Sequence, residues 1–559
     1  MRPSPPGNIL DIFRNAADSD VSISFVDAEA GGRLSWKDIW QNARIIAASL
    51  QKKCIAEGDV VMIALPTSRE FVETYVATVI CGALPFVVSR VTGAADKAVA
   101  LERQKYLCQQ TSAALLITDE IEIETIFAAS AVGLQTRTLT YTDLINAADG
   151  GCKIVQRSWL DAAIVQTSSG STGKPSCLLL SNKNLVTNLR QLASALQVDH
   201  NDKVVSWLPL FHDMGLIGCF MLPVFCLIPT YLMKPMTFLR RPLRLLYEIT
   251  EHAGTISPSP NFAYNRLIAQ VARADKERLD LRSWRIAGCG SEPINPSTMH
   301  EFIRLYSRLG LSDSAFTPGY GMSEATLCIS SMPINEPPKT KVHRIGKKNK
   351  HNCNRDRWRT EDRYMEVVNC GLPVDGIVVD IVDEHGHSLP ENESGRILID
   401  GESVFDAQYV DGKKIVRETG LYDTGDIGFL ADGYLYLTGR NKDIIIINGK
   451  NYTSYFFEHV AEGYSSHLTG RTLAFGLVDN NVSGAAQEEK LHLLVETPHG
   501  VELRPQAIEA YVAKKTSIKP RVTLVAKNSL PRTTSGKLQR QIARQRFKQD
   551  QDELFAITL

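Results

Sequence analysis

The sequence predicts an α/β protein with a large N-terminal domain and a small α+β C-terminal domain. Its 559 residues exceed the length at which a single hydrophobic core stops growing, so we expect at least two domains. Over residues 1–160, short apolar segments alternate with helical ones, which is typical of a parallel sheet covered on both faces by helices. After Thr424 the pattern changes to alternating apolar residues separated by turns, which indicates hairpins.

Hydrophobic periodicity defines the first elements. We expect a helix from Leu34 to Leu50, a β-branched strand from Asp59 to Pro66 and a second helix from Phe71 to Cys81. Further strands of the same alternating pattern are expected at 114–118, 163–165 and 203–207.

Residues 216–233 form an apolar stretch that is about long enough to span a membrane. Pro223 and Pro229 interrupt it, no basic residues flank its N-terminal side, and it directly follows His212 and Asp213. We therefore predict a buried core segment beside a pocket and no membrane span.

The best domain boundary is the turn Gly439–Lys442, which divides the chain into residues 1–440 and 441–559. Residues 333–363 stand apart as an insertion in the first part. Ten Lys or Arg fall between Lys339 and Arg363, against three Asp or Glu, with almost no apolar periodicity. Two interpretations stay open, a solvated loop and a docking patch for an acidic partner.

Composition excludes several classes of function. Lys plus Arg equals Asp plus Glu at 62 each, so no overall field favours nucleic acid or an anionic membrane as a partner. The eleven cysteines are scattered without a CxxC pair, which predicts neither a zinc cluster nor a redox pair. The N-terminus lacks the apolar run of a secretory signal, and a reducing cytoplasm is expected.

The first chemical motif is the loop 167–174 (TSSGSTGK), directly after a predicted strand. Glycines let backbone N–H groups approach phosphate oxygens closely, and hydroxyls add further donors. It is not a Walker A loop, because Ser168 stands where the first glycine would be and Pro175 follows Lys174. A different phosphate-binding loop is indicated, although the pattern alone would also suit a flexible linker.

Two further motifs carry single carboxylates. Glu324 lies in the hydroxyl-rich turn 320–326, and one carboxylate beside substrate phosphates suits Mg²⁺; alone, it would also suit a helix N-terminus. Asp426 lies in LYDTGDIG, residues 421–428, where it could accept two ribose hydroxyls.

The last two motifs lie further along the chain. Residues 438–443 (TGRNKD) open the C-terminal domain, and 530–538 (LPRTTSGKL) is a polar turn that presents Lys537. Each motif is weak by itself, whereas the five in this order and spacing are specific.

The set resembles the superfamily of adenylate-forming enzymes, from about residue 10 to about residue 545. Within it, three segments resemble the fatty acyl-AMP ligases: 207–218 (WLPLFHDMGLIG), 257–264 (SPSPNFAY) and 290–294 (GSEPI). The basic insertion also falls where that branch carries its characteristic insertion.

The resemblance implies a large N-terminal domain of stacked α/β subdomains and a small mobile α+β C-terminal lid. It implies that ATP and a carboxylic acid, expected to be a fatty acid, form an acyl-adenylate with release of pyrophosphate. The lid then pivots at Lys442, and the acyl group passes to the phosphopantetheine thiol of a separate acyl carrier protein.

The resemblance also implies roles for individual residues. The β- and γ-phosphates of ATP would be bound by the loop residues Thr167, Ser168, Ser169, Gly170, Ser171, Thr172, Gly173 and Lys174, and the α-phosphate by Ser323. The adenine would contact Gly290, Ser291, Glu292 and Tyr320, with Gly321 and Met322 beside them. Asp426 would bind the ribose, and Arg440 would lie near the ribose and the phosphates. Glu324 would hold Mg²⁺, and Lys537 would neutralise charge between the carboxylate and the α-phosphate. His212 would gate the acyl tunnel or be a structural histidine, and Phe262 and Tyr264 would form its walls.

The chain departs from the fatty acyl-AMP ligase pattern at two places. Residues 449–458 (GKNYTSYFFE) lack the usual proline and one acidic residue, which leaves the acyl acceptor open. Ser323 stands where alanine is usual, so the acid is not fixed as an ordinary long fatty acid. The alternatives are an acyl- or aryl-CoA synthetase and, more remotely, a catalytically silent acyl-nucleotide-binding homologue.

Overall fold

The largest sheet forms the N-terminal end of the molecule in the computed structural model, which describes residues 6–27, 32–92, 97–129, 136–146, 151–168, 175–345, 363–447, 450–478, 489–498, 500–532 and 538–549. The strand order is β21-β20-β8-β7-β4-β3-β5-β6. Its strands are β3 (Val60–Ile63), β4 (Leu84–Val87), β5 (Leu115–Thr118), β6 (Thr138–Thr140), β7 (Ala162–Thr167), β8 (Cys177–Ser181), β20 (Ala407–Val410) and β21 (Lys413–Val416). The five strands from β7 to β6 are parallel, as predicted, whereas β8, β20 and β21 pair antiparallel.

Helices cover both faces of this sheet. Val61 and Ile63 of β3 join one core, while Val60 and Met62 join the other. The surrounding helices are α1 (Ile9–Ala17), α2 (Trp36–Lys52), α3 (Arg69–Ile80), α4 (Lys97–Thr111), α5 (Glu120–Ala129), α6 (Tyr141–Asn146) and α7 (Asn182–Ala195). Residues of α3 pack in the first core and residues of α4 in the second, because alternate side chains of a strand point to opposite faces.

Two smaller sheets follow in the chain. One has the order β2-β1-β10-β9 and the other β11-β12-β13-β14-β17. Their strands are β1 (Ser22–Phe25), β2 (Gly32–Ser35), β9 (Val204–Ser206), β10 (Thr230–Leu232), β11 (Ser259–Pro260), β12 (Ala287–Gly290), β13 (Phe316–Gly321), β14 (Cys328–Ser331) and β17 (Leu372–Pro373). Helices α9 (Pro235–Arg240), α10 (Leu243–His252), α11 (Asn261–Gln270) and α12 (Pro296–Tyr306) lie in the same part of the chain. The strand expected at 203–207 is thus present as β9, but in a sheet separate from β3 and β7.

The apolar stretch 216–233 is buried. It forms the π-helix η1 (Met214–Met221), α8 (Leu222–Cys226) and β10. Phe220 is fully buried among the rings of Phe13, Trp36, Phe71 and Tyr75, which accounts for the apolar character of the segment. In the described part of the chain, no helix has the length and apolar character to cross a membrane.

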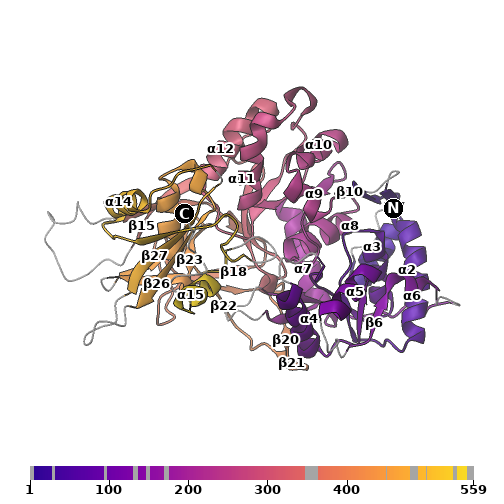
Figure 1. Ribbon diagram of the computed structural model, residues 1–559. Helices are drawn as coiled ribbons and strands as arrows, with labels where there is room; N and C mark the ends of the chain where they lie inside the picture. The colour runs from indigo at the N-terminus through magenta and orange to yellow at the C-terminus, as the bar shows by residue number, and fades with distance from the viewer. Residues whose placement is uncertain are drawn as a thin grey trace.

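A four-stranded antiparallel sheet leads to the C-terminal part, at the opposite end of the molecule from α2 and α6 (Figure 1). Its strands are β18 (Val378–Val382), β19 (Gly395–Asp400), β22 (Tyr422–Ala431) and β23 (Tyr434–Arg440). Beyond it come η7 (Asn441–Asp443), β24 (Ile444–Ile447), β25 (Lys450–Thr453), α13 (Ser454–Glu462), β26 (Thr472–Val478), β27 (Glu489–Glu496), α14 (Pro505–Thr516), β28 (Arg521–Val525) and α15 (Arg540–Gln549). The hairpins expected after Thr424 are therefore β22–β23 and β24–β25.

The basic insertion is not a loop throughout, contrary to one of its two interpretations. Its ends form the antiparallel hairpin β15 (Thr340–Ile345) and β16 (Arg363–Val368), while residues 346–362 lie outside the described residues. Alternation along β16 buries Met365 and Val367 in one core with Tyr452, Phe456 and other C-terminal residues. Periodicity in the short segment 363–368 was hidden by the charged residues around it.

Candidate active site

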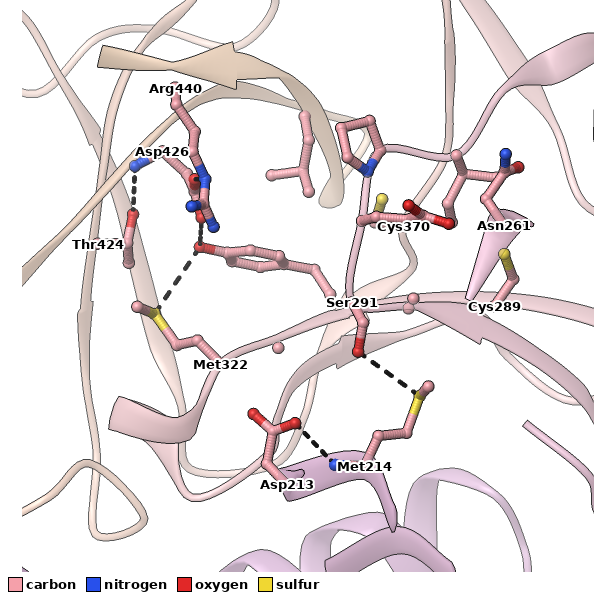
Figure 2. A pocket seen from close by; sticks show the side chains of 18 of the residues that line it. Asp213, Met214, Asn261, Cys289, Ser291, Met322, Cys370, Thr424, Asp426 and Arg440 are labelled. Atoms are coloured by element: carbon pink, nitrogen blue, oxygen red, sulfur yellow. Dashed lines mark hydrogen bonds and ion pairs between the residues drawn. The ribbon is translucent and has the colours of Figure 1, made fainter. Parts of the chain in front are cut away.

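A cavity of about 740 Å³ lies where the N-terminal sheets meet the C-terminal part. It is bordered by the ends of β12 and β13, by β22 and β23, and by α13 and the start of α15. Figure 2 shows Asp426 and Arg440 on one side of this pocket and Ser291, Met214 and Asp213 on another. Residues from motifs more than a hundred positions apart in the chain therefore share one cavity.

Asp426 is the centre of a polar cluster on β22 and β23. The Tyr320 hydroxyl donates to Asp426 Oδ2 at 2.7 Å, and Arg440 Nε lies 2.8 Å from Asp426 Oδ1. The carboxylate beside it raises the pKa of Arg440, and burial raises the pKa of Tyr320, so the phenol stays protonated. Asp426 is thus a fixed, 6% exposed carboxylate whose remaining lone pairs can accept hydrogen bonds from a bound diol.

Backbone forms the next wall of the cavity. β12 ends at Gly290, and Ser291 adopts a left-handed conformation with φ of 68°. At Gly321, at the end of β13, an added Cβ would lie 1.8 Å from the carbonyl oxygen of Leu327, so only glycine fits. Gly290, Ser291, Glu292, Gly321 and Met322 all line the cavity. Glu292 also braces the wall, since its Oε1 accepts from the backbone N of Phe262 at 2.6 Å.

Glu324 lies in the 3₁₀ turn Ser323–Ala325 that follows β13. Burial raises its pKa, and the Asp213 carboxylate raises it further, while the Ser168 hydroxyl and Arg440 act in the opposite direction. The Ser323 hydroxyl donates to Asp213 Oδ2 at 2.8 Å. Two carboxylates and two hydroxyls thus converge, a donor set that suits Mg²⁺. Sequence reasoning missed Asp213, although it caps the π-helix η1 directly after His212.

An apolar arm extends the cavity between α7, η1 and β12. Its walls are Leu192, Leu196, Gly218, Leu222, Ile256, Ile286 and Leu327. His212 lines the cavity near the start of η1, with its ring 4.7 Å from that of Phe211. The apolar character of these walls suits an aliphatic or aromatic chain.

Phe262 and Tyr264 do not line the cavity, contrary to the pocket-wall expectation. Tyr264 is fully buried, its hydroxyl donates to the Gly288 carbonyl at 2.7 Å, and its ring packs against Phe302 and Phe316. The Phe262 ring lies 6.0 Å from that of Trp207. In α11 it is Asn261 that faces the cavity, because the residues after it turn towards the core.

Part of the predicted site lies outside the described residues, namely 169–174 and Lys537. Their neighbours lie at the cavity. Thr167 and Ser168, at the end of β7, and Pro175 line it, and so does Leu538.

The C-terminal part closes the cavity through specific contacts. Tyr455 donates to the Ile294 carbonyl at 3.1 Å, and Asn295 Nδ2 donates to Glu462 Oε2 at 2.9 Å. These bonds join α13 to the loop that follows Gly290. Sequence reasoning missed this pair of contacts, because they connect residues more than 160 positions apart.

Arg540 connects the start of α15 to the segment after β23. Its guanidinium bonds both carboxylate oxygens of Glu458, at 2.8 and 2.6 Å, and Asp443 Oδ2 at 3.1 Å. Gln541 donates to the Lys442 carbonyl at 3.1 Å. Burial, together with the charge of Arg440, lowers the pKa of Lys442, which also lines the cavity.

Comparisons with known proteins agree with this arrangement. A family model described as AMP-binding enzyme matches residues 12–407. A putative acyl-CoA synthetase of Caulobacter vibrioides is 29% identical, over 95% of this chain and 93% of its own. The long-chain-fatty-acid–AMP ligase FadD26 of Mycobacterium tuberculosis is 28% identical, over 92% of both chains. A medium-chain-fatty-acid–[acyl-carrier-protein] ligase, JamA of Moorena producens, is 27% identical over 92% of this chain and 90% of its own.

Solved structures give the same result. A structure from studies of fatty acyl-adenylate ligases from E. coli and L. pneumophila superposes with a TM-score of 0.85, at 28% identity over 97% of both chains. The crystal structure of a fatty acid AMP ligase from Legionella pneumophila gives a TM-score of 0.70, at 26% identity over 98% of this chain and 96% of that one. The predicted fold class, a large α/β N-terminal and a small C-terminal domain, is thereby confirmed. The chain belongs to the AMP-binding enzyme family and is an adenylate-forming ligase.

Proposed function

We propose that this enzyme activates a fatty acid with ATP and passes the acyl group to the phosphopantetheine thiol of a separate acyl carrier protein. One observation carries the first half of the proposal. The Asp426–Arg440 pair and the Glu324–Asp213 carboxylates lie at different sides of one cavity, and an apolar arm opens into the same space.

Asp426 accepts the ribose hydroxyls, held in place by Tyr320 and Arg440. The main chain at Gly290–Glu292 and at Gly321–Met322 packs against the adenine. These donors and acceptors are already in place before ATP binds. Such preorganisation of polar groups, together with positioning of the reactants, is the main source of rate enhancement available to this kind of site.

Glu324 and Asp213, with Thr167 and Ser168 nearby, are positioned for the phosphate end of ATP. Mg²⁺ held by Glu324 would screen the negative charge of the phosphates and orient them. We assign the β- and γ-phosphates to the loop that begins at Thr167.

The acid lies in the apolar arm with its carboxylate beside His212. A carboxylate oxygen forms a bond to the α-phosphorus, the bond from that phosphorus to the bridging oxygen breaks, and pyrophosphate leaves with the electron pair. Lys537 neutralises the charge that builds up between the carboxylate and the α-phosphate. The position of Leu538 at the cavity supports this role.

We propose that residues 1–440 and 441–559 act as the two domains and that Lys442 is their hinge. Support comes from η7, the short segment that connects β23 to β24. The enzyme is proposed to act in the cytoplasm.

The second half of the proposal, transfer to a carrier protein, is supported by the insertion hairpin. Met365 and Val367 of β16 are buried in the same core as Ile445, Tyr452 and Phe456 of the C-terminal part. A rotation large enough to break this packing would expose these side chains to water, so we expect the C-terminal part to turn only as far as the narrow phosphopantetheine arm of a carrier requires. FadD26 and JamA, whose names specify an AMP ligase and an acyl-carrier-protein ligase, are similar over more than nine tenths of this chain.

ATP–pyrophosphate exchange across a panel of carboxylic acids tests the first half. We expect exchange with aliphatic acids, lost on chelation of Mg²⁺ and restored by its return; no exchange with any acid would contradict the proposal. The acceptor is then tested by offering CoA or a phosphopantetheinylated carrier protein and measuring thioester. Efficient acyl-CoA formation would instead establish an acyl-CoA synthetase.

A further inference from the structure

Arg103 brings a cationic side chain to the cavity from outside the five motifs. It lies in the middle of α4, whose neighbouring apolar residues Leu101 and Leu107 pack in the core on one face of the large sheet. Arg103 itself lines the cavity, together with Thr167, Ser168, Pro175 and Ser176. It therefore lies where β7 ends and where the chain returns towards β8.

Arg103 has no counter-charge within the residues that the structure describes. Its Nε is buried without a hydrogen-bond partner. Burial lowers its pKa, yet the guanidinium remains charged, and the ionisable group that acts on it is the Cys177 thiol. Burial raises the pKa of that thiol to about 12, so it is neutral near pH 7 and provides no charge.

Two other arginines, in segments that flank strands of the large sheet, have carboxylate partners. Arg90 contacts the carboxylates of Asp119 and Glu122, and Arg157 lies 3.1 Å from Glu57. A desolvated guanidinium without a carboxylate is costly, and an anion that enters the cavity offsets that cost. The planar guanidinium of Arg103 can donate two parallel hydrogen bonds to two oxygens of one phosphate.

We propose that Arg103 binds the terminal phosphates of ATP and the departing pyrophosphate. This inference rests on the proposed function and assigns a residue to it that no motif indicated. The cavity wall beside Arg103 contains Thr167 and Ser168, whose hydroxyls are the next donors to the same anion. The phosphodiester of a phosphopantetheine arm is also an anion with phosphate oxygens that Arg103 could bind. The experiment must therefore distinguish this phosphodiester from pyrophosphate.

The direct test is calorimetric titration of the full-length protein with inorganic pyrophosphate. Arg103→Ala and Arg103→Met should weaken binding by about 10–100-fold, since a charge-assisted contact is lost. Met keeps the aliphatic packing, so its result holds even if the Ala variant folds poorly. Lys97→Ala removes one positive charge from an exposed site on the same helix and should leave the affinity unchanged. Equal affinity in all four proteins, or absence of binding to the unsubstituted protein, would overturn the assignment.

Exchange kinetics separate the two phosphate sources. We expect Arg103→Met to raise the KM for pyrophosphate by the same factor, with kcat within about threefold, because binding and not chemistry is altered. Normal exchange combined with slow transfer to the carrier protein would assign Arg103 to the phosphodiester and overturn the pyrophosphate role. Absence of exchange in the unsubstituted enzyme would contradict the proposed function, whereas the titration would still decide whether Arg103 binds pyrophosphate.

Discussion

Asp426 Oδ1 and Arg440 Nε lie 2.8 Å apart, and the two residues are direct partners in the register of β22 and β23. The sheet therefore fixes both main chains of the pair. The Tyr320 hydroxyl holds the second carboxylate oxygen from β13. The orientation of the carboxylate is set before any nucleotide binds.

Asp426→Asn should raise the KM for ATP by about 10–100-fold, since the amide loses the charge that orders Arg440 and one acceptor for the diol. The measurement is the ATP dependence of pyrophosphate exchange. Asp400→Asn is a matched control, because that carboxylate is half exposed on neighbouring β19. An unchanged KM for ATP in Asp426→Asn would remove the ribose assignment.

Lys537→Ala should reduce exchange by at least ~10²–10³-fold, the loss of about 3–4 kcal/mol that follows removal of one donor to a developing charge. ATP binding, measured by calorimetry, should persist. Lys527→Ala alters an exposed lysine of the same C-terminal part and should behave like the unsubstituted enzyme. Near-normal exchange in Lys537→Ala would refute the catalytic role.

Gly218→Leu should shift the preference towards shorter acids. Gly218 lines the apolar arm, and a Cβ there would meet Leu327 at 3.2 Å, so larger atoms extend into the space for the acyl chain. We expect kcat/KM for long acids to fall by about 10–100-fold relative to short ones, measured by exchange over a chain-length series.

Gly215→Ala is the contrast within the same π-helix. Its Cβ would lie 2.2 Å from the Pro209 carbonyl oxygen, so this variant should lower the melting temperature. Equal losses for long and short acids in Gly218→Leu would contradict the assignment of the arm.

Glu462 should make stability depend on pH. Burial raises the pKa of this carboxyl to about 8, with smaller increases from Glu458 and Glu292, while Gly470 and Asn295 donate to it. In the unfolded chain it titrates near 4.5, so the folded state binds the proton more tightly. The contribution of the protonated form is complete below pH 4.5 and is lost as pH rises through about 8.

The measurement is the free energy of unfolding at pH 5, 6.5 and 8.5 for the unsubstituted protein and Glu462→Gln. Their difference should change by more than about 1 kcal/mol across this range, with the unsubstituted protein losing stability as pH rises. Parallel pH profiles would show that Glu462 is ionised when folded.

Much of the fold and site could be predicted because the signals are local. Asp426 and Glu324 lie in short motifs whose residue types indicate a nucleotide site. The hairpins after Thr424 follow from alternating apolar residues separated by turns. Strand partners are not local. The sequence therefore did not show that β9 pairs in a sheet separate from β3 and β7, although its pairing with β10 is parallel, and the antiparallel edge of β8 and β20 was missed.

The same limit applies to the site. Whether an aromatic residue of α11 faces a cavity or a core depends on the packing of α12 and β13, which no motif encodes. Tyr264 was therefore misplaced. Asp213 and Arg103 were overlooked because each belongs to the site only through residues that are remote in sequence and that the fold brings next to it.

β23 ends at Arg440, and η7 begins at the next residue. The side chain that holds Asp426 and the proposed pivot at Lys442 therefore share one short length of main chain. A turn at the pivot would pull on the Arg440 backbone and loosen its contact with Asp426. In the proposed mechanism this connection would couple two events: AMP would be held firmly while the adenylate is formed and released when the acyl acceptor takes its place.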